Sequence, residues 1–269
     1  MMTELVLYEV RDGVATITLN RPERLNAISP RLDEELLGHL GAAEADAGVH
    51  CAVIQGAGRC FSSGADTKRD EASGQLVPTS ATADRDGREA NLRRYLRVWD
   101  LRIPVIAKVH GYCLGRATQL VLSCDVAFAA EDAVIGAPRL PLGAGFNAVF
   151  WAWHVGPKRA KEVFLPTGGA IDGRTAARWG IVNDAVPLDQ LDARVEGYTR
   201  KLTRTPRELL ALQKQAINRT QEVRGMREAL AQSVEVNIVG HHSESVHAVN
   251  RDILARGLRA TLEDRAGDG

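Results

Sequence analysis

The first part of the chain alternates hydrophobic and polar positions in the way that paired strands do. Residues 4–10 and 14–19 alternate regularly, which is typical of half-buried strands. Arg11-Asp12-Gly13 between them favours a hairpin turn, so the chain is predicted to open with a β-meander. An apolar run at residues 50–55 predicts a further, buried strand.

Elsewhere hydrophobic positions recur with a helical period. Ser29-Pro30 supplies an N-cap and a first-turn proline for a helix that runs to about residue 47. Its inward stripe consists of Leu32, Leu36, Leu37 and Leu40. From Leu188 onward no strand signal survives, and four helices are predicted near residues 188–203, 207–219, 225–239 and 243–257. Such helices cannot all bury their apolar stripes on one small sheet, so part of that surface is expected to meet other subunits.

The central stretch, residues 103–143, combines a strand, a glycine turn and a helix. An apolar run at 104–109 predicts a buried strand, Gly111 and Gly115 follow as turn signals, and 118–123 has the length of a short buried helix. A helix start leaves unpaired backbone N–H groups and the positive end of the helix dipole, which suit negative charge developing on a substrate oxygen. Residues 115–117 are therefore a candidate oxyanion site, with plain turn chemistry as the alternative.

Two further segments have a composition that favours contact with a ligand. The small-residue turn at 61–66 would let the backbone approach a ligand closely, although an ordinary loop has the same composition. Residues 67 to about 89 are rich in charge, Ser and Gly, and predict a mobile segment over the pocket. The hydrophobic residues that follow, Leu92, Tyr95, Leu96 and Trp99, are interpreted as core packing.

Composition narrows the classes of function. The 269 residues contain 45% hydrophobic residues and equal numbers of basic and acidic ones, 34 of each, so no overall field favours nucleic acid or an anionic membrane. No helix shows a dense basic stripe, no apolar run reaches the length of a membrane span, and the amino terminus does not resemble a secretion signal. The cysteines lack the spacing of a zinc site or a disulfide framework and are interpreted as reduced thiols of a cytoplasmic protein. They are Cys51, Cys60, Cys113 and Cys124.

Five parts of the sequence, at their spacings, resemble one family over nearly the whole chain. They are VATITLNRPERLNAIS at 14–29, CFSSGADTK at 60–68, IPVIAKVHGYCLG at 103–115, SCDVAFAAEDAVIGAPRLPLG at 123–143, and the helical tail. The sequence is similar to the enoyl-CoA hydratase/isomerase family, also called the crotonase superfamily. The resemblance implies an α/β fold with a crotonase-like ββα spiral core over residues 1–187 that binds an acyl-CoA thioester. It also implies a helical region over residues 188–269 that builds trimers and often hexamers, and no cofactor or metal beyond the CoA moiety of the substrate.

The resemblance also assigns roles to particular residues. The family's two backbone N–H donors, which form its oxyanion hole, map onto Ala65 and Arg116. Addition, isomerisation and thioester cleavage all place charge on the carbonyl oxygen, where preorganised donors are worth several kcal/mol, roughly 3 to 4 for each. The residues implied along the CoA pantetheine and adenine are Glu23, Arg24, Leu25, Ser63, Asp66 and Thr67. Asp66 has an alternative role as the cap of its own turn.

Four positions depart from the family pattern, three of them where relatives carry catalytic carboxylates. The two glutamates that family hydratases use on water map onto Gln119 and Arg139, and Asn147 stands where some relatives carry an aspartate. Neither an amide nor a guanidinium can act as a general base at neutral pH, so two-glutamate hydration is disfavoured. Isomerisation, decarboxylation or hydrolysis of an acyl-CoA is predicted instead. A non-catalytic acyl-CoA-binding homologue, and an enoyl-CoA hydratase with a displaced catalytic group, are the alternatives.

Arg116 and Arg139 stand where the family normally has glycine and glutamate. They are predicted either to bind a second anion, an acyl carboxylate, through their guanidinium forks, or to be structural, with Arg139 paired to an acid such as Asp125. The candidate proton-transfer groups near the mapped pocket are His110, Tyr112, Cys113, His154 and Asp66. Of these, His110 at a strand end is interpreted as a hydrogen-bonded core histidine rather than a base.

Overall fold

A computed structural model describes residues 4–66, 80–143 and 145–266 of the chain. Its larger sheet has six strands in the order β1-β2-β3-β4-β6-β9. These are β1 (Val6–Arg11), β2 (Val14–Leu19), β3 (Cys51–Gly56), β4 (Val105–Val109), β6 (Val126–Ala130) and β9 (Asp184–Val186). β1 and β2 form the predicted antiparallel hairpin, with Val6 opposite Leu19, and every other neighbouring pair is parallel.

A second sheet of three strands lies beside the first and contains β5 (Tyr112–Leu114), β7 (Val134–Gly136) and β8 (Ala170–Asp172). The chain visits the two sheets in turn: β4 is followed by β5, β6 by β7, and β8 by β9. This alternation winds the backbone into a spiral, as the resemblance implied. It also brings the ends of β4, β5 and the loop after β3 to one place, because each turn of the spiral stacks on the preceding one.

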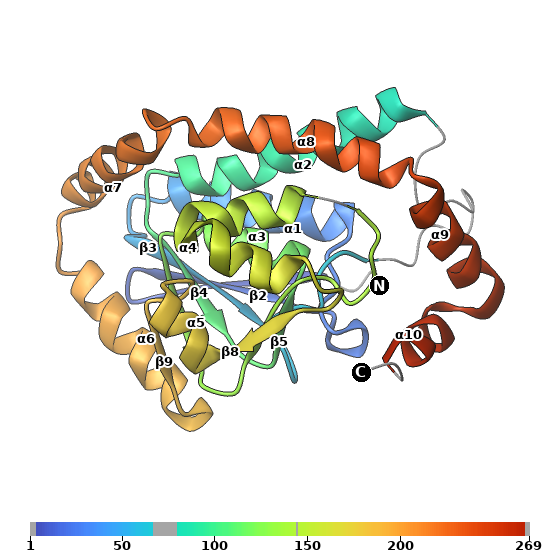
Figure 1. Ribbon diagram of the computed structural model, residues 1–269. Helices are drawn as coiled ribbons and strands as arrows, with labels where there is room; N and C mark the ends of the chain where they lie inside the picture. The colour runs from blue at the N-terminus through green and yellow to red at the C-terminus, as the bar shows by residue number, and fades with distance from the viewer. Residues whose placement is uncertain (1–3, 67–79, 144, 267–269) are drawn as a thin grey trace.

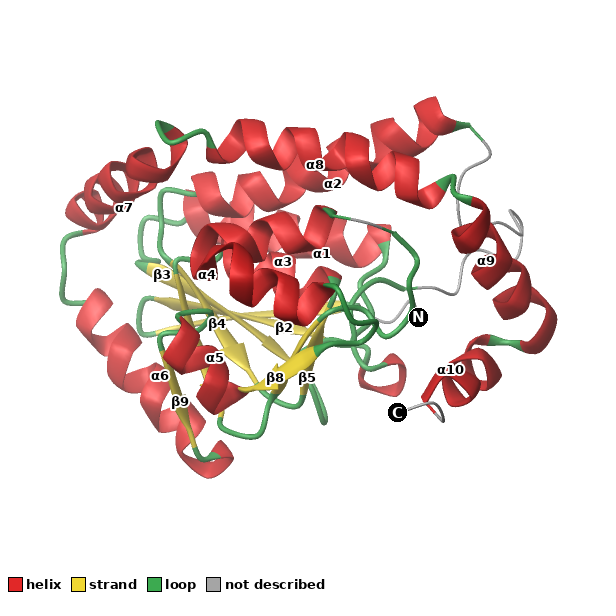
Figure 2. Cartoon of the chain, viewed as in Figure 1, coloured by secondary structure: helices red, strands yellow, loops and turns green. Residues whose placement is uncertain are grey.

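Helices cover the sheets, as Figure 1 and Figure 2 show. The described ones are the 3-10 helix η1 (Pro22–Arg24) and α1 (Pro30–Ala45), α2 (Ala81–Asp100), α3 (Arg116–Ser123), α4 (Phe146–Phe164), α5 (Gly173–Trp179), α6 (Leu188–Leu202), α7 (Arg207–Glu222), α8 (Met226–His241), α9 (Glu244–Arg256) and α10 (Leu258–Ala266). In the figures α1 to α4 lie on one side of the larger sheet, and α8 runs along α2 above them. The helix α3 is thus enclosed between the sheet and an outer helical layer.

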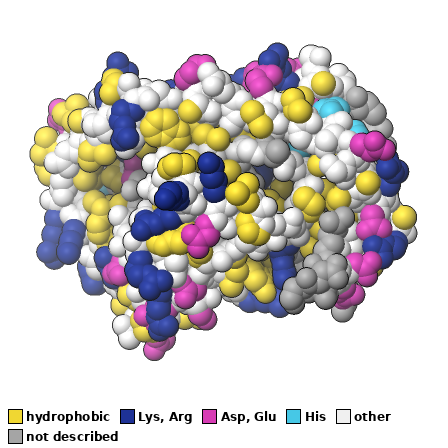
Figure 3. Space-filling view, in the orientation of Figure 1, with side chains coloured by type: hydrophobic (Ala, Val, Ile, Leu, Met, Phe, Trp, Pro, Cys, Tyr) yellow, Lys and Arg dark blue, Asp and Glu magenta, His cyan; other side chains and the backbone are white. Residues whose placement is uncertain are grey.

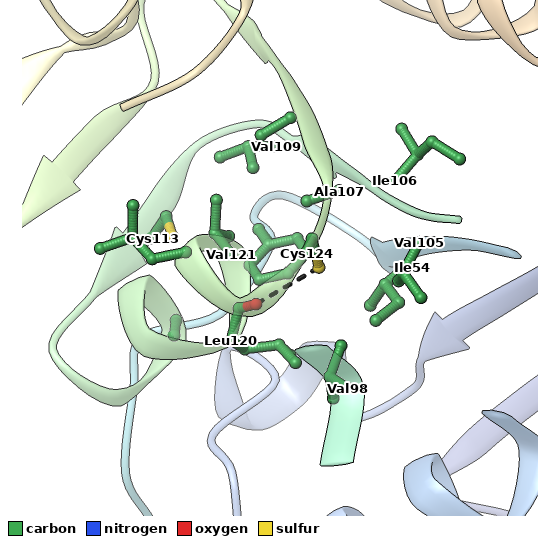
Figure 4. Close-up of a cluster of buried hydrophobic side chains, with 14 of the residues drawn as sticks. Ile54, Val98, Val105, Ile106, Ala107, Val109, Cys113, Leu120, Val121 and Cys124 are labelled. Atoms are coloured by element: carbon green, nitrogen blue, oxygen red, sulfur yellow. Dashed lines mark hydrogen bonds between the residues drawn. The ribbon is translucent and has the colours of Figure 1, made fainter. Parts of the chain in front are cut away.

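The core between the larger sheet and α3 is apolar and tightly closed. Figure 4 shows Leu120 and Val121 of α3 among side chains of β4 such as Ala107 and Val109, all of them buried. Cys124 belongs to this cluster, and its thiol lies 3.3 Å from the Leu120 carbonyl oxygen. All four cysteines are free, as the sequence predicted, and all four are also buried. The apolar packing holds α3 rigidly, so that its first residues keep a fixed place at the turn after β5.

The structure departs from the sequence-based prediction in three respects. Residues 81–89, expected in a mobile segment, form the first part of α2, which Ser80 caps through its side chain; residues 67–79 lie outside the described part. The helix α10 was not predicted. Leu37 is only half buried, whereas Leu32, Leu36 and Leu40 are buried as expected. The division at residues 187/188 stays a prediction: strands end at β9, but α8 packs against α2 and α4 of the preceding part.

Candidate active site

Three loops meet at the start of α3 and are joined through their backbones. Ser62 bridges Cys113 of β5, and Ala65 bridges Ile28, which precedes α1. The Ile28 N–H donates to the Gly64 carbonyl at 2.7 Å, and the Asp66 N–H donates to the Ile28 carbonyl at 3.0 Å. The predicted small-residue turn therefore lies between the loop before α1 and the turn after β5.

Gly64 allows the closest of these approaches. A Cβ at this position would lie 2.5 Å from the Leu114 carbonyl oxygen and 3.5 Å from the Arg116 nitrogen, and the φ of Gly64 is +100°. Both the space and the conformation exclude a larger residue. Because Gly64 directly precedes Ala65, the two predicted oxyanion donors come from segments in contact with each other.

The N–H groups of Ala65 and Arg116 donate no hydrogen bond to any residue that the structure describes. Ala65 is exposed, and Arg116 is the first residue of α3, whose N–H has no partner inside the helix. The φ of +53° at Gly115 turns the chain into this helix, and Pro138 packs against that glycine. Two open donors on neighbouring backbone segments could bind one oxyanion.

The side chain of Arg116 turns into the helical layer and is held there by α1 and α2. Its Nε donates to the Tyr95 hydroxyl at 2.6 Å, and its Nη2 donates to the Asn91 side-chain oxygen at 2.7 Å. The same nitrogen forms an ion pair with Asp33, and both side chains are largely buried, 13% and 4% exposed. A protein acid therefore already neutralises Arg116, as the structural alternative predicted, and this side chain is not a free binder of substrate anions.

The electrostatics of this cluster follow from its burial. Burial raises the pKa of Asp33, and the nearby Arg116 and Arg94 offset part of that rise. Burial alone would lower the pKa of Arg116, but Tyr95 and Asp33 outweigh it, so the guanidinium stays charged. Burial also raises the pKa of Tyr95, which remains a neutral phenol. We conclude that Asp33 is the charged partner that makes a buried arginine tolerable at this turn.

Gln119 and Arg139 lie in very different surroundings. Gln119 is one turn after Arg116 on α3 and is 2% exposed, and its Nε2 has no hydrogen-bond partner among the described residues. Arg139 is exposed and forms no ion pair within the described part of the chain. The acid that was suggested as its partner, Asp125, instead pairs with Lys214 at 2.8 Å, so that pairing was wrong.

Asp66 forms ion pairs with two arginines from the segment before α1. Its carboxylate lies 2.8 Å from the Arg21 guanidinium and 3.7 Å from that of Arg24. Glu23 is exposed in η1, Leu25 ends η1 with a φ of +51°, and Ser63 donates its N–H to the Leu25 carbonyl at 2.9 Å. These residues form one continuous rim beside the open donors. Thr67, the remaining residue predicted to contact CoA, lies outside the described residues.

Comparison with known proteins identifies the family. Residues 9–265 match the family model described as Enoyl-CoA hydratase/isomerase. The chain belongs to the enoyl-CoA hydratase/isomerase family. The resemblance of the five sequence segments is thereby confirmed.

Individual members of the family agree with this result. A crystal structure of an enoyl-CoA hydratase/isomerase from Xanthobacter autotrophicus Py2 shares 37% identity, with a TM-score of 0.91 over 100% of this chain and 99% of that one. A protein named probable enoyl-CoA hydratase from Rhizobium meliloti (strain 1021) is 33% identical over 83% of this chain and 84% of its own length. A hydroxycinnamoyl-CoA hydratase-lyase of Pseudomonas fluorescens is 31% identical over 69% of this chain and 68% of its own. The predicted crotonase-like spiral fold is confirmed.

The candidate proton-transfer groups of this family member are mostly engaged elsewhere. His110 is half buried, with its Nε2 2.9 Å from the Gly58 carbonyl oxygen, which agrees with its interpretation as a hydrogen-bonded histidine. Cys113 is fully buried, and burial raises the pKa of its thiol far above neutrality. His154 is exposed on α4, and Tyr112 is half buried on β5. Among the described residues, no group of three or more His, Cys, Asp or Glu side chains could hold a metal ion.

Sequence reasoning missed a second buried polar cluster between α2 and α8. Asp84 is fully buried, its Oδ2 lies 2.8 Å from Nδ1 of His241, and the Asn237 amide lies 3.1 Å from Nε2 of the same ring. Burial lowers the pKa of His241, and Asp84 offsets part of the effect. A Cβ at Gly143 would lie 2.8 Å from that ring, so the cluster contacts the loop after Arg139. The helical spacing of Asp84, Asn91 and Tyr95 in the sequence could have indicated that these polar residues lie on one face of a helix.

Proposed function

We propose that this protein processes an acyl-CoA thioester, binding the thioester oxygen with the backbone N–H groups of Ala65 and Arg116, and that it does not carry out ordinary two-glutamate hydration. The observation that carries the proposal is the chemistry at position 119. Gln119 is buried, its Nε2 is without a partner among the described residues, and an amide cannot accept a proton at neutral pH.

The role of Gln119 follows from what an amide can do. Its Nε2 can donate a hydrogen bond to a polar atom of the acyl group. A buried donor without a hydrogen-bond partner costs about 1–3 kcal/mol of free energy. A substrate with an acceptor near the thioester would satisfy it. Isomerisation, decarboxylation or hydrolysis of such an acyl-CoA fits this site better than addition of a water held by two carboxylates. Ala65 and Arg116 would stabilise the charge that each of these reactions places on the oxygen.

More specifically, the acyl group of the substrate would carry a carboxylate. Arg116 no longer supports it, because Asp33 neutralises that guanidinium. Arg139 does support it, since it is exposed, has no ion pair among the described residues, and follows Pro138, which packs on the turn before α3. A charge-assisted contact from Arg139 would favour an anionic acyl-CoA by about 1.5–3 kcal/mol, roughly tenfold to hundredfold in Kd.

Other features complete the proposal. CoA would lie along the rim formed by Glu23, Arg24, Leu25, Ser63 and Asp66, continuing to Thr67, with no cofactor beyond the CoA moiety. The protein would act in the cytoplasm, without nucleic acid or a membrane as partner. None of the described helices is long and apolar enough to cross a membrane.

The protein would assemble as a homotrimer or a hexamer. Large hydrophobic side chains remain exposed on the C-terminal helices, among them Leu212 and Ile217 on α7 and Val236 and Val239 on α8. Figure 3 shows hydrophobic side chains scattered over one face of the molecule among charged ones. Contact between subunits would bury this surface.

A screen of acyl-CoA esters against the purified protein tests the proposal. Mass spectrometry should find an ester bound and converted to product, with a preferred substrate that carries a polar or anionic acyl group. Crotonyl-CoA should bind but be hydrated very slowly, because losing a general base costs about 10²- to 10⁴-fold. Crotonyl-CoA turnover of about 10 per second or more would contradict the reading of positions 119 and 139. Binding without conversion of any ester would favour the non-catalytic alternative.

A further inference from the structure

The most unusual feature of the site is that the side chain of one predicted backbone donor is itself anchored. Arg116 receives contacts from three residues on two helices: Asp33 on α1, and Asn91 and Tyr95 on α2. Its guanidinium also lies over the Tyr95 ring, 5.8 Å from the centroid. Tyr95 in turn is fixed by an edge-to-face contact with Phe150 of α4, with ring centroids 6.2 Å apart.

The Arg116 N–H is also constrained from the side of the turn. Gly115, the residue before it, has a φ of +53° and a ψ of −115°, a conformation available only to glycine, whose backbone is the most adaptable. The Arg116 N–H itself belongs to the peptide that joins these two residues. The carbonyl oxygen of that peptide accepts hydrogen bonds from the Thr118 hydroxyl at 2.7 Å and the Thr118 N–H at 3.0 Å. The side-chain contacts of Arg116 add a further tether from the helical side.

We propose that Asp33 is a positioning residue for the reaction, and that Tyr95 and Asn91 assist it: by holding the Arg116 guanidinium, these side chains fix the backbone N–H that polarises the thioester carbonyl. This inference rests on the proposed function, because it presupposes that the Arg116 N–H binds the thioester oxygen. Asp33 does not touch the substrate and acts through Arg116. The chain thus compensates on α1 and α2 for a large charged side chain at its oxyanion turn.

A second buried ion pair in the molecule provides a matched control. Lys214 of α7 pairs with Asp125 at 2.8 Å, and both side chains are largely buried, 6% and 16% exposed. Asp125 lies just beyond the last residue of α3, whereas Arg116 is the first, so the two pairs anchor opposite ends of one helix. Asp125→Asn and Asp33→Asn therefore weaken comparable ion pairs, of which only one adjoins the donor.

The experiment measures carbonyl polarisation directly and requires no turnover. Crotonyl-CoA labelled with ¹³C at the thioester carbonyl is bound to the intact protein, and its C=O stretch is recorded by isotope-edited infrared spectroscopy. Affinity is measured in parallel by calorimetry. In the wild type, the band should lie below that of the ester in water. In Asp33→Asn the band should move much of the way back to its position in water, and in Tyr95→Phe it should move back by a smaller amount. In Asp125→Asn it should stay where it is in the wild type. The affinities of all three variants should lie within about threefold of the wild type.

On a substrate that the enzyme converts, Asp33→Asn should lower kcat by up to about 10²-fold with little change in KM, the size expected when a catalytic group is misplaced by about 1 Å. Tyr95→Phe keeps the ring against Phe150 and should fold even where Asp33→Asn does not. An unchanged band in both variants would overturn the inference and leave Asp33 as a purely stabilising residue. An equal change in Asp125→Asn would do the same. A wild-type band that is not lowered, or no binding at all, would contradict the proposed function itself.

Discussion

Restoring carboxylates at positions 119 and 139 should convert this protein towards a hydratase. The informative variant is Gln119→Glu/Arg139→Glu, assayed with crotonyl-CoA. A general base typically contributes about 10²- to 10⁴-fold in rate, so on the proposed assignment the double variant should exceed the wild type by at least about 10²-fold. Gln119→Glu alone should gain much less, because a guanidinium still occupies the second position.

The same structure sets the cost of the change. Position 119 is 2% exposed, so a glutamate there would be buried, and burial raises a carboxyl pKa by up to about 3–5 units. A rise of about 2 units corresponds to roughly 3 kcal/mol. A raised pKa in the folded state penalises the charged form, so this loss is absent below the unfolded pKa of about 4.3 and develops as pH rises towards the folded value. Urea unfolding at pH 4 and pH 8 measures it.

Progress curves of crotonyl-CoA hydration, followed by loss of the conjugated thioester absorbance, give the activity. Gln119→Glu/Arg139→Gln is the matched control, because it removes the guanidinium without supplying a second carboxylate. A folded double variant that binds crotonyl-CoA but gains less than about tenfold would refute the assignment of these two positions.

Three further outcomes are expected. Light scattering at micromolar concentration should show a trimer or hexamer, and a stable monomer would contradict the proposed role of the C-terminal helices. Burial lowers the pKa of His241, so as pH falls its imidazole is protonated in the unfolded state before it is in the folded state. The free energy of unfolding should therefore fall as pH drops below about 6.5. In urea titrations between pH 5 and 7.5, His241→Gln should weaken this pH dependence. Lys214→Met should cost roughly 3–5 kcal/mol in urea unfolding because it leaves Asp125 buried without its cation, and adding Asp125→Leu should recover much of the loss.

Local patterns were sufficient for most of the fold. The hairpin of β1 and β2, the capped helix α1 and the helices from α6 to α9 all follow from periodicity and capping residues, which act within a few positions of each other. The start of α2 was missed for a physical reason. Its first turns carry Asp84, Arg85, Asp86, Arg88 and Glu89 in close succession, and such a density of charge is also typical of loops. Tertiary contacts with α8 decide between the two, and a single sequence does not display them.

The candidate site divides in the same way. The glycines at 64 and 115 were recognisable because their backbone conformations and close contacts demand glycine. The orientation of Arg116 was not recognisable, because it depends on partners 83 and 25 positions away, Asp33 and Asn91. An anion-binding arginine and an internally neutralised one have the same local sequence. Of the two alternatives for Arg116, the binding of a second anion is contradicted for this reason and the structural role holds. The exposed Arg139 remains a candidate for contact with an anionic acyl group.

The identity of residue 116 therefore cannot be considered apart from that of residue 33. An arginine at the start of α3 is tolerable only because a carboxylate reaches it from α1, and that carboxylate is tolerable at 4% exposure only because the arginine is there. Arg116→Gly alone would restore the residue usual in the family. It would also leave Asp33 buried in the helical layer without its cation, and an unpaired buried charge carries a large desolvation penalty. Returning this turn to the common pattern requires both changes together, so the unusual residue at the proposed oxyanion turn depends on the α1–α2–α3 layer as a whole.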